Sequence, residues 1–236
     1  MTEITVVMAT RNAAAYVTEA LTSVMEQAAT SALQVVVVDA DSTDGTPDLV
    51  RRFPRVKLER QTGAGLWQAW NQVITAATTP FIAMLDSDDR WEPGTVQAHL
   101  RAFDARPDAM ASIGRTRFFL QGEVLPAGIR PQILHDSHRG AIPGATMYRR
   151  EVFDVLGLFP EDIPTASDVD WFLRLRQSGL VIAEPAEVVL AKRVHADHLG
   201  GEFARGSQYD RDLIRIARES LLRRRAATAA DRLGVS

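Results

Sequence analysis

The chain of 236 residues contains no cysteine. This absence excludes a disulfide scaffold, a thiolate zinc site, an iron–sulfur cluster and a cysteine nucleophile. An excess of one charge is lacking too, because 27 basic residues stand against 30 acidic ones and give a formal net charge of −3. Since binding to nucleic acid depends on a positive surface, the composition predicts no nucleic-acid partner.

Long apolar runs are also missing, and none approaches the roughly 20 residues that a helix needs to cross a bilayer. Residues 1–3 lack the basic start and cleavage site of a signal peptide and lead directly into a strand-like run. We therefore expect a cytoplasmic protein. Hydrophobic residues make up 46% of the chain, which is typical of a globular protein with a large core. The length predicts one domain, or two small ones.

The first half of the chain alternates between two periodicities. Continuous apolar runs predict strands at residues 4–9, 33–38, 56–60 and 80–85, and helical spacing predicts helices at residues 13–27, 47–52, 66–76 and 93–105. Asn12 offers a cap for the first helix. Strands that alternate with helices in this way predict parallel βαβ units, in which helices cover both faces of the sheet.

The second half is less regular. The pattern predicts strands at residues 110–113, 115–120, 145–148 and 181–191, a long loop at residues 125–142, and helices at residues 167–177 and 209–230. The last helix is rich in arginine. Because no repeat, low-complexity tract or linker interrupts the chain, we expect one domain.

Polar clusters follow three of the predicted strands, at residues 10–12, 39–44 and 86–89. Parallel sheets bind ligands at these carboxyl ends. In the third cluster Asp86, Asp88 and Asp89 would repel one another, and a divalent cation would compensate this repulsion. Mg²⁺ and Mn²⁺ prefer oxygen ligands and typically take one or two carboxylates together with substrate phosphates. The alternative is a solvated turn that caps the next helix.

Five motifs taken together resemble the family 2 glycosyltransferases, which have the GT-A fold. In chain order they are ITVVMATRN at residues 4–12, VVVDADSTDGT at 36–46, GLWQAWN at 65–71, FIAMLDSDDRWEPG at 81–94, and GLFPE at 157–161 followed by SDVDWFLR at 167–174. The resemblance implies an α/β GT-A domain over residues 1–205, with a Rossmann-like, mostly parallel sheet flanked by helices. Residues 1–105 would form the nucleotide-sugar-binding half, residues 106–205 the smaller acceptor-binding half, and residues 206–236 a basic C-terminal helix.

The resemblance also implies roles for the matched residues. The implied substrate-binding residues are Thr10, Asn12, Asp39, Asn71, Asp86 and Asp170; the implied metal ligands are Asp88 and His195; and the implied catalytic base is Asp168. Asp39 would bind the nucleobase, and Asp86 would contact the ribose or a metal-bound water. His198 is a second candidate beside His195, and a surface loop is the alternative for both. Arg193 or Lys192 would steady a phosphate, or would be solvated charges.

The implied function is an inverting glycosyltransferase that uses Mn²⁺ or Mg²⁺ and a nucleotide-sugar donor, with a UDP-sugar as the first expectation. The acceptor would be a hydroxyl of a saccharide or of a lipid-linked molecule. A sugar-nucleotide pyrophosphorylase is one alternative, but its chemistry needs a glycine-rich loop after the first strand, and residues 9–13 contain no glycine. A non-catalytic module that binds only nucleotide or carbohydrate is the other.

Four positions depart from the family pattern. Arg11 stands where an aromatic residue is common, Ala40 replaces an Asp, Asp41 replaces a Gly, and Ser167 stands where a Glu precedes the base. Ser167 and Asp170 also have the spacing of a capping box, which offers a structural alternative for this pair. The C-terminal helix combines arginines with leucine and isoleucine. It would contact the inner face of an anionic membrane, or else pack on the domain or on a second copy of the chain.

Overall fold

The computed structural model describes residues 2–28, 31–126, 129–195 and 207–233. Its strands are β1 Glu3–Thr10, β2 Ala32–Asp39, β3 Val56–Arg60, β4 Phe81–Met84, β5 Arg90–Trp91, β6 Ala109–Ile113, β7 Arg115–Leu120, β8 Ser137–Arg139, β9 Thr146–Arg149, β10 Val181–Ala183 and β11 Val188–Val194. Its helices are α1 Val17–Gln27, α2 Thr46–Val50, α3 Leu66–Ala76, α4 Thr95–Ala105, α5 Val152–Leu156, α6 Ser167–Gln177 and α7 Gln208–Leu233, with short 3₁₀ turns at Pro131–Leu134 and Pro143–Ala145.

The main sheet has seven strands in the order β10-β6-β9-β4-β1-β2-β3. All neighbours in it are parallel except β9, which runs antiparallel to β4 and β6. The register pairs Thr10 at the end of β1 with Asp39 at the end of β2. The mostly parallel α/β sheet predicted from the sequence is therefore confirmed, and two of the predicted polar clusters begin side by side.

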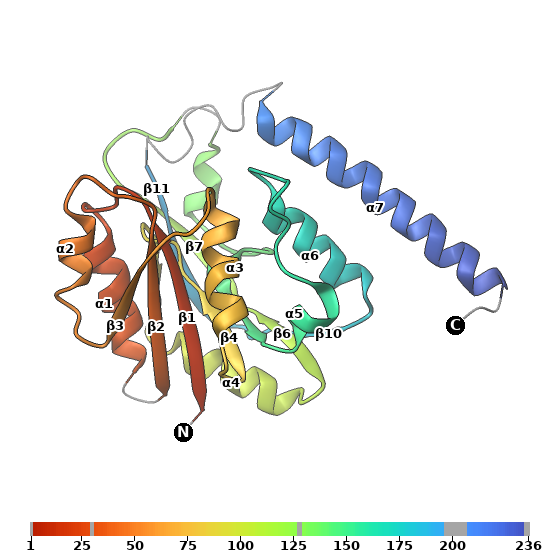
Figure 1. Ribbon diagram of the computed structural model, residues 1–236, viewed down its shortest axis with the longest axis horizontal. Coiled ribbons are helices and arrows are strands. Elements are labelled where there is room, and N and C mark those ends of the chain that lie inside the picture. Colours follow the sequence, from red (N-terminus) through yellow and green to blue (C-terminus); the bar gives the residue numbers. More distant parts are fainter. Residues whose placement is uncertain (1, 29–30, 127–128, 196–206, 234–236) are drawn as a thin grey trace.

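Helices cover both faces of this sheet (Figure 1). Buried side chains of α1, α2 and α4 form the core on one face, and those of α3, α5 and α6 form the core on the other. The second core is aromatic: the rings of Trp171 and Phe159 stack with centroids 5.3 Å apart, and Trp70 meets Phe159 edge to face at 5.5 Å. Such pairs rigidify the packing of α3 against α6.

A second sheet of four strands, in the order β5-β11-β7-β8, was not predicted. The single strand predicted at residues 181–191 is wrong, because β10 joins the main sheet and β11 joins the second one. Pro185 lies between them and has no N–H to continue a ladder. Gly114 lies between β6 of the main sheet and β7 of the second sheet, at a point where a Cβ would lie 2.4 Å from the Val189 side chain.

Two predicted caps are wrong. Asn12 has a φ of 51° and α1 begins only at Val17, without a side-chain cap. Ser167 is already inside α6, whose N-cap is Ala166, so the capping box of Ser167 and Asp170 does not form. The predicted loop at residues 125–142 contains a 3₁₀ turn and strand β8 in its described part.

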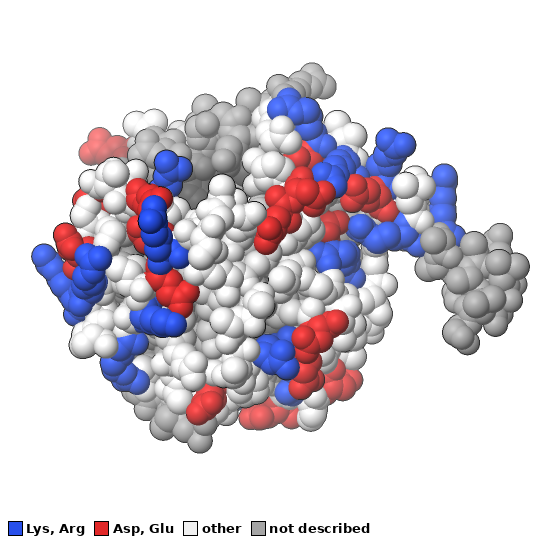
Figure 2. All heavy atoms as spheres, in the orientation of Figure 1, with Lys and Arg blue, Asp and Glu red and all other residues white. Residues whose placement is uncertain are grey.

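Helix α7 packs along α6, and its C-terminal end extends away from the domain (Figure 1). Ile216 is buried beside Ile163 and Ala166, and Asp212 accepts hydrogen bonds from the Thr165 N–H at 3.0 Å and the Thr165 hydroxyl at 2.8 Å. Basic side chains recur along α7 with acidic ones beside them (Figure 2). The described helices include none that is long and apolar enough to span a membrane.

Candidate active site

The ends of β1 and β2 form a polar wall. Thr10 and Asp39 are both buried, and one Asp39 oxygen, Oδ2, accepts a hydrogen bond from the Ser42 N–H at 3.0 Å. The other Asp39 oxygen, Oδ1, and the Thr10 hydroxyl are buried without a hydrogen-bond partner. Because buried polar groups are normally paired, these two atoms leave the wall able to bind a polar ligand.

Asn12 connects the loops that follow these two strands. Its side-chain oxygen accepts a hydrogen bond from the Thr43 N–H at 2.8 Å, and its own N–H donates to the Ser42 hydroxyl at 2.8 Å. The predicted substrate-binding residue thus has a structural task within the protein.

Asp41 occupies the position where the family has a glycine, and its φ of 54° lies in the left-handed region. Asp tolerates this conformation better than most residues. Its carboxylate also pairs with the Arg60 guanidinium, with Nε and Oδ1 2.8 Å apart. The departure from the family pattern therefore leaves the loop able to turn.

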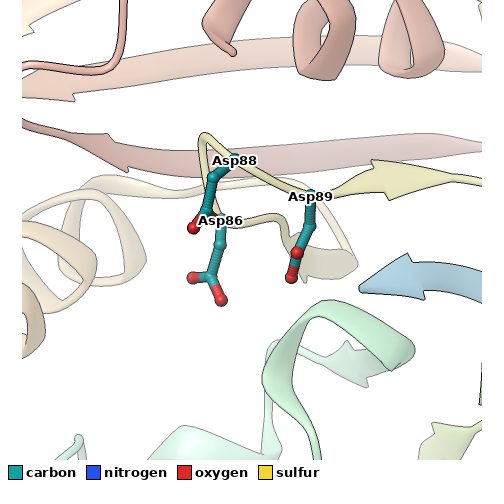
Figure 3. Close-up of side chains that lie close together, drawn as sticks. All are labelled: Asp86, Asp88 and Asp89. Atoms are coloured by element: carbon teal, nitrogen blue, oxygen red, sulfur yellow. The ribbon is translucent and has the colours of Figure 1, made fainter. Parts of the chain in front are cut away.

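The carboxylates of Asp86, Asp88 and Asp89 project in the same general direction from the loop between β4 and β5 (Figure 3). One oxygen from each lies within 4.8 Å of one oxygen from each of the other two. Asp89 is fully buried, whereas Asp86 and Asp88 are partly exposed. Such a set of carboxylates suits a hard divalent cation.

Lys192 of β11 completes this cluster. Its ammonium donates to Asp89 Oδ2 at 2.8 Å and to Asp86 Oδ2 at 3.2 Å. Burial raises the pKa of the Asp89 carboxyl to about 6, although the Lys192 charge lowers it. Burial alone would lower the pKa of Lys192, but the charges of Asp89 and Asp86 outweigh this effect and raise it. The lysine is therefore charged at neutral pH.

Arg193 stabilises the same loop through hydrogen bonds to two of its residues. Its backbone N–H donates to Asp89 Oδ1 at 2.8 Å, and its Nε donates to the Asp88 carbonyl at 2.7 Å. The guanidinium lies 4.6 Å from the Phe119 ring centre and 5.1 Å from that of Tyr16, and it pairs with Glu19. The sequence alone allows two roles for Lys192 and Arg193, as phosphate contacts or as solvated charges. The signal that could have marked them is two cations inside a strand that is otherwise apolar.

His195 follows β11 directly and lies at the predicted site. Its Nε2 is 3.2 Å from Asp88 Oδ2, and its ring is 5.0 Å from that of Tyr16. The two residues predicted to hold a metal are thus neighbours, although one precedes β5 and the other follows β11. The second candidate, His198, falls outside the described residues.

Asp168 lies in the first turn of α6. Burial raises the pKa of its carboxyl to about 6, the Val169 N–H lowers it, the charge of Asp86 raises it further, and Lys192 opposes this rise. The carboxyl is therefore within electrostatic range of the acid cluster. A carboxylate with a pKa near the working pH is suited to accept a proton.

Two predicted substrate-binding residues have protein partners. Asp170 is buried and receives hydrogen bonds from Arg174 and Arg223, each at 2.9 Å. Asn71 is buried as well; its amide donates to the Phe159 carbonyl at 2.9 Å and its oxygen accepts from the Phe159 N–H at 3.1 Å. The protein contacts of these side chains hold α6 and the segment before it in place.

A sequence model of the family described as "Glycosyl transferase family 2" matches residues 5–157. The chain belongs to the family 2 glycosyltransferases. The match includes the polar wall at the ends of β1 and β2 and the cluster of Asp86, Asp88 and Asp89, while Asp168, Lys192 and His195 lie beyond its end.

Solved structures show that this family 2 chain also shares the fold of known glycosyltransferases. TarS of S. aureus in complex with UDP-GlcNAc superposes with a TM-score of 0.71 over 92% of this chain and 66% of that one, at 19% identity. The mannosyltransferase PcManGT of Pyrobaculum calidifontis in complex with GDP-Man and Mn²⁺ gives 0.60 over 80% and 56%, at 24% identity. The predicted GT-A fold is thereby confirmed.

Among curated relatives, the glycosyltransferase TuaG of Bacillus subtilis, whose name refers to teichuronic acid biosynthesis, is 28% identical over 75% of this chain and 73% of its own length. Proteins of Mycobacterium are 26% identical, and the aligned region spans 56% of their length. This family 2 chain therefore spans about half the length of the first curated relatives that it matches.

Proposed function

We propose that the protein is an inverting glycosyltransferase that moves a sugar from a nucleotide-sugar to an acceptor hydroxyl. The observation that carries this proposal is the position of Asp168, a carboxyl whose pKa is raised to about 6 within electrostatic range of Asp86 in the acid cluster. A proton acceptor beside a candidate diphosphate site is what transfer from a nucleotide-sugar to a hydroxyl requires.

The donor base would lie against the wall formed by Thr10 and Asp39. The unpartnered Asp39 oxygen can accept a hydrogen bond from a nucleobase N–H, and the Thr10 hydroxyl can donate or accept one. Uracil presents an N–H at N3, which matches a carboxylate acceptor. A UDP-sugar thus fits this wall, and the complex of TarS with UDP-GlcNAc supports this donor.

The residues of the acid cluster fit Mn²⁺ or Mg²⁺. Asp88 and His195 would hold the ion, with Asp86 on a ligand water or on the ribose. Asp89 has both oxygens engaged by Lys192 and Arg193, so we leave it out of the ligand set. When bound, the cation would supply Lewis-acid stabilisation of the diphosphate leaving group. The complex of PcManGT with GDP-Man and Mn²⁺ supports this assignment.

Asp168 would act on the acceptor. The acceptor oxygen attacks the anomeric carbon while its proton passes to the Asp168 carboxylate, and the bond between that carbon and the diphosphate breaks. This single displacement inverts the anomeric configuration. The partly buried position of Asp168 helps, because desolvation raises the basicity of its carboxylate.

The acceptor would be a saccharide or a lipid-linked molecule, and α7 bears on the second choice. Ile214, Leu221 and Leu222 are exposed on this helix, together with Arg218 and Arg225. A face that combines apolar and basic side chains favours an anionic membrane surface, here the inner face of the cytoplasmic membrane. Sedimentation with vesicles that contain anionic lipid tests this contact, and light scattering tests the homodimer that would otherwise cover the face.

The experiment that tests the function is a screen of nucleotide-sugars by thermal shift with Mn²⁺, followed by turnover of each stabilising donor. A ligand that binds only the folded state raises Tm. We expect a UDP-sugar to stabilise the protein and to be hydrolysed slowly. Release of a sugar 1-phosphate from a UDP-sugar and pyrophosphate would indicate a pyrophosphorylase instead. Tight UDP binding without turnover of any donor would indicate a non-catalytic module.

The matched variants are Asp168→Asn and Asp154→Asn. Asp154 is exposed on α5, and its one ion pair among the described residues is with Arg150 one turn away. We expect Asp168→Asn to abolish transfer while donor binding stays, and Asp154→Asn to leave both unchanged. Loss of donor binding in Asp168→Asn would refute the role of Asp168 as base.

A further inference from the structure

The acid cluster contains a lysine in a chain that otherwise uses arginine. Only Lys57 and Lys192 are lysines, against 25 arginines. The Lys57 side chain is 70% exposed, whereas that of Lys192 is 18% exposed. An ammonium is a compact point charge, while a guanidinium is a broad planar fork. Position 192 therefore holds the more compact of the two kinds of cation, with its side chain largely buried.

Asp89 fixes this ammonium in place. The Asp89 side chain is fully buried, and its Oδ1 is held by the Arg193 backbone N–H at 2.8 Å. The Lys192 ammonium lies 2.8 Å from Oδ2 of the same carboxylate and 3.2 Å from Asp86 Oδ2. These two bonds use two of its three N–H groups. Asp86 is partly exposed, so the ammonium lies between the buried carboxylate of Asp89 and a carboxylate that solvent can reach.

The neighbouring cation, the side chain of Arg193, is fully engaged by partners within the protein. The Arg193 guanidinium donates to the Asp88 carbonyl and to Gln121, pairs with Glu19, and lies against the rings of Tyr16 and Phe119. Its side chain is only 6% exposed. The backbone thus places two consecutive cations at the cluster, and one of them is committed to bracing the loop.

Charge balance at the cluster indicates a role for the Lys192 ammonium. The carboxylates of Asp86, Asp88 and Asp89 carry three negative charges, which would repel a diphosphate. A divalent cation offsets two of these charges, and the Lys192 ammonium offsets the third. A phosphate oxygen that approaches the cluster would then meet no net repulsion.

We propose that Lys192 contacts the diphosphate of the donor, held in place by Asp89, and that Arg193 only positions the loop. This inference rests on the proposed nucleotide-sugar function. It predicts a specific division of binding free energy, in which Lys192 contributes to binding of the diphosphate and not of the nucleoside.

The test compares UDP with uridine in calorimetric titrations with saturating Mg²⁺. We expect Lys192→Met to weaken UDP binding by about 10- to 100-fold, as for the loss of one hydrogen bond to a charged group, and to leave uridine binding unchanged. Lys57→Met is the matched control and should change neither affinity. The double variant Lys192→Met with Asp89→Asn removes both charges of the pair, so it protects against misfolding caused by an unpaired buried carboxylate.

A second measurement uses the unaltered protein. Labelling with ¹³C-lysine gives signals from only two side chains, and Lys57→Met assigns them. We expect the Lys192 Cε signal to shift with UDP and to stay in place with uridine, in Mg²⁺ buffer. Equal UDP affinities in wild type, Lys192→Met and the double variant, or equal shifts with UDP and uridine, would overturn the role of Lys192. Failure of the wild type to bind any nucleoside diphosphate would refute the proposed function itself.

Discussion

The carboxylate of Asp170 joins helix α6 to the C-terminal helix, because its Oδ1 accepts a hydrogen bond from Arg223 at 2.9 Å. Its other oxygen accepts one from Arg174, one turn further along α6, also at 2.9 Å. Two residues earlier in the same helix stands Asp168, the proposed base. The ion pairs of Asp170 thus hold the first turn of α6, on which the position of Asp168 depends.

The first prediction concerns Asp170→Asn. We expect this change to lower Tm by about 5–10 °C, because it removes a buried carboxylate that two arginines contact, a loss of roughly 2–3 kcal/mol. Donor affinity should change little, since both oxygens of Asp170 are engaged within the protein. Thermal unfolding and UDP titration of Asp170→Asn measure the two quantities. A large loss of UDP affinity at unchanged Tm would show that Asp170 binds substrate after all.

Much of the fold could be predicted because local signals and long-range packing agree in the first half. The strand at Val56–Arg60 and the helices at Leu66–Ala76 and Ser167–Gln177 have the predicted bounds. Their apolar spacing is the spacing that the two cores require. Asp88 and His195 were paired only through the family resemblance, and their proximity in space agrees with it.

The other features of the fold and the site depend on contacts between distant residues, which the hydrophobic periodicity of the sequence does not reveal. Strand β11 leaves the main sheet because Pro185 interrupts the run and because Val189 packs against Gly114. Asn71 was assigned to substrate from its motif, yet it bonds to Phe159, which is 88 residues away along the chain. Lys192 was ambiguous for the same reason: its partners Asp86 and Asp89 follow another strand.

The second prediction concerns the metal. We expect Asp88→Ala to weaken Mn²⁺ binding at least 10-fold, because it removes a proposed ligand and the partner of His195. Titration followed by electron paramagnetic resonance measures the affinity. The matched control is Asp104→Ala, an exposed carboxylate on α4. Equal Mn²⁺ affinities in the two variants would remove Asp88 from the ligand set.

The third prediction concerns pH. Burial raises the pKa of Asp168 to about 6, and only the carboxylate form can accept a proton. We therefore expect kcat/KM to be level above pH 6 and to fall about tenfold per pH unit below it. The raised pKa also means that folding disfavours the ionised form, so this group lowers stability as pH rises from about 4, the ordinary pKa of an aspartic acid, to about 6. Asp168→Asn should accordingly raise Tm at neutral pH while it abolishes transfer.

Two outcomes would contradict this assignment. An inflection of kcat/KM near the ordinary pKa of an aspartic acid, about 4, would mean that Asp168 is not the group that titrates. A Tm for Asp168→Asn below that of the wild type at pH 7 would mean that the carboxylate is stabilised in the folded protein. The profile should be measured at subsaturating donor, because kcat/KM reports the free enzyme.

The last prediction concerns base selection. Asp39 Oδ1 is buried without a partner beside the Thr10 hydroxyl, so it can accept the N3–H of uracil. Cytosine has an acceptor at N3, which would face the carboxylate with like polarity. We expect the wild type to bind UDP at least 10-fold more tightly than CDP, because a mismatched base leaves a buried charge unpaired. In Asp39→Asn, whose amide can donate to cytosine N3, this ratio should fall toward one.

Calorimetric titration of UDP and CDP with Mg²⁺ gives the ratio, and Asp48→Asn on the exposed side of α2 is the control. Equal affinities for UDP and CDP in the wild type would show that Asp39 does not face the base.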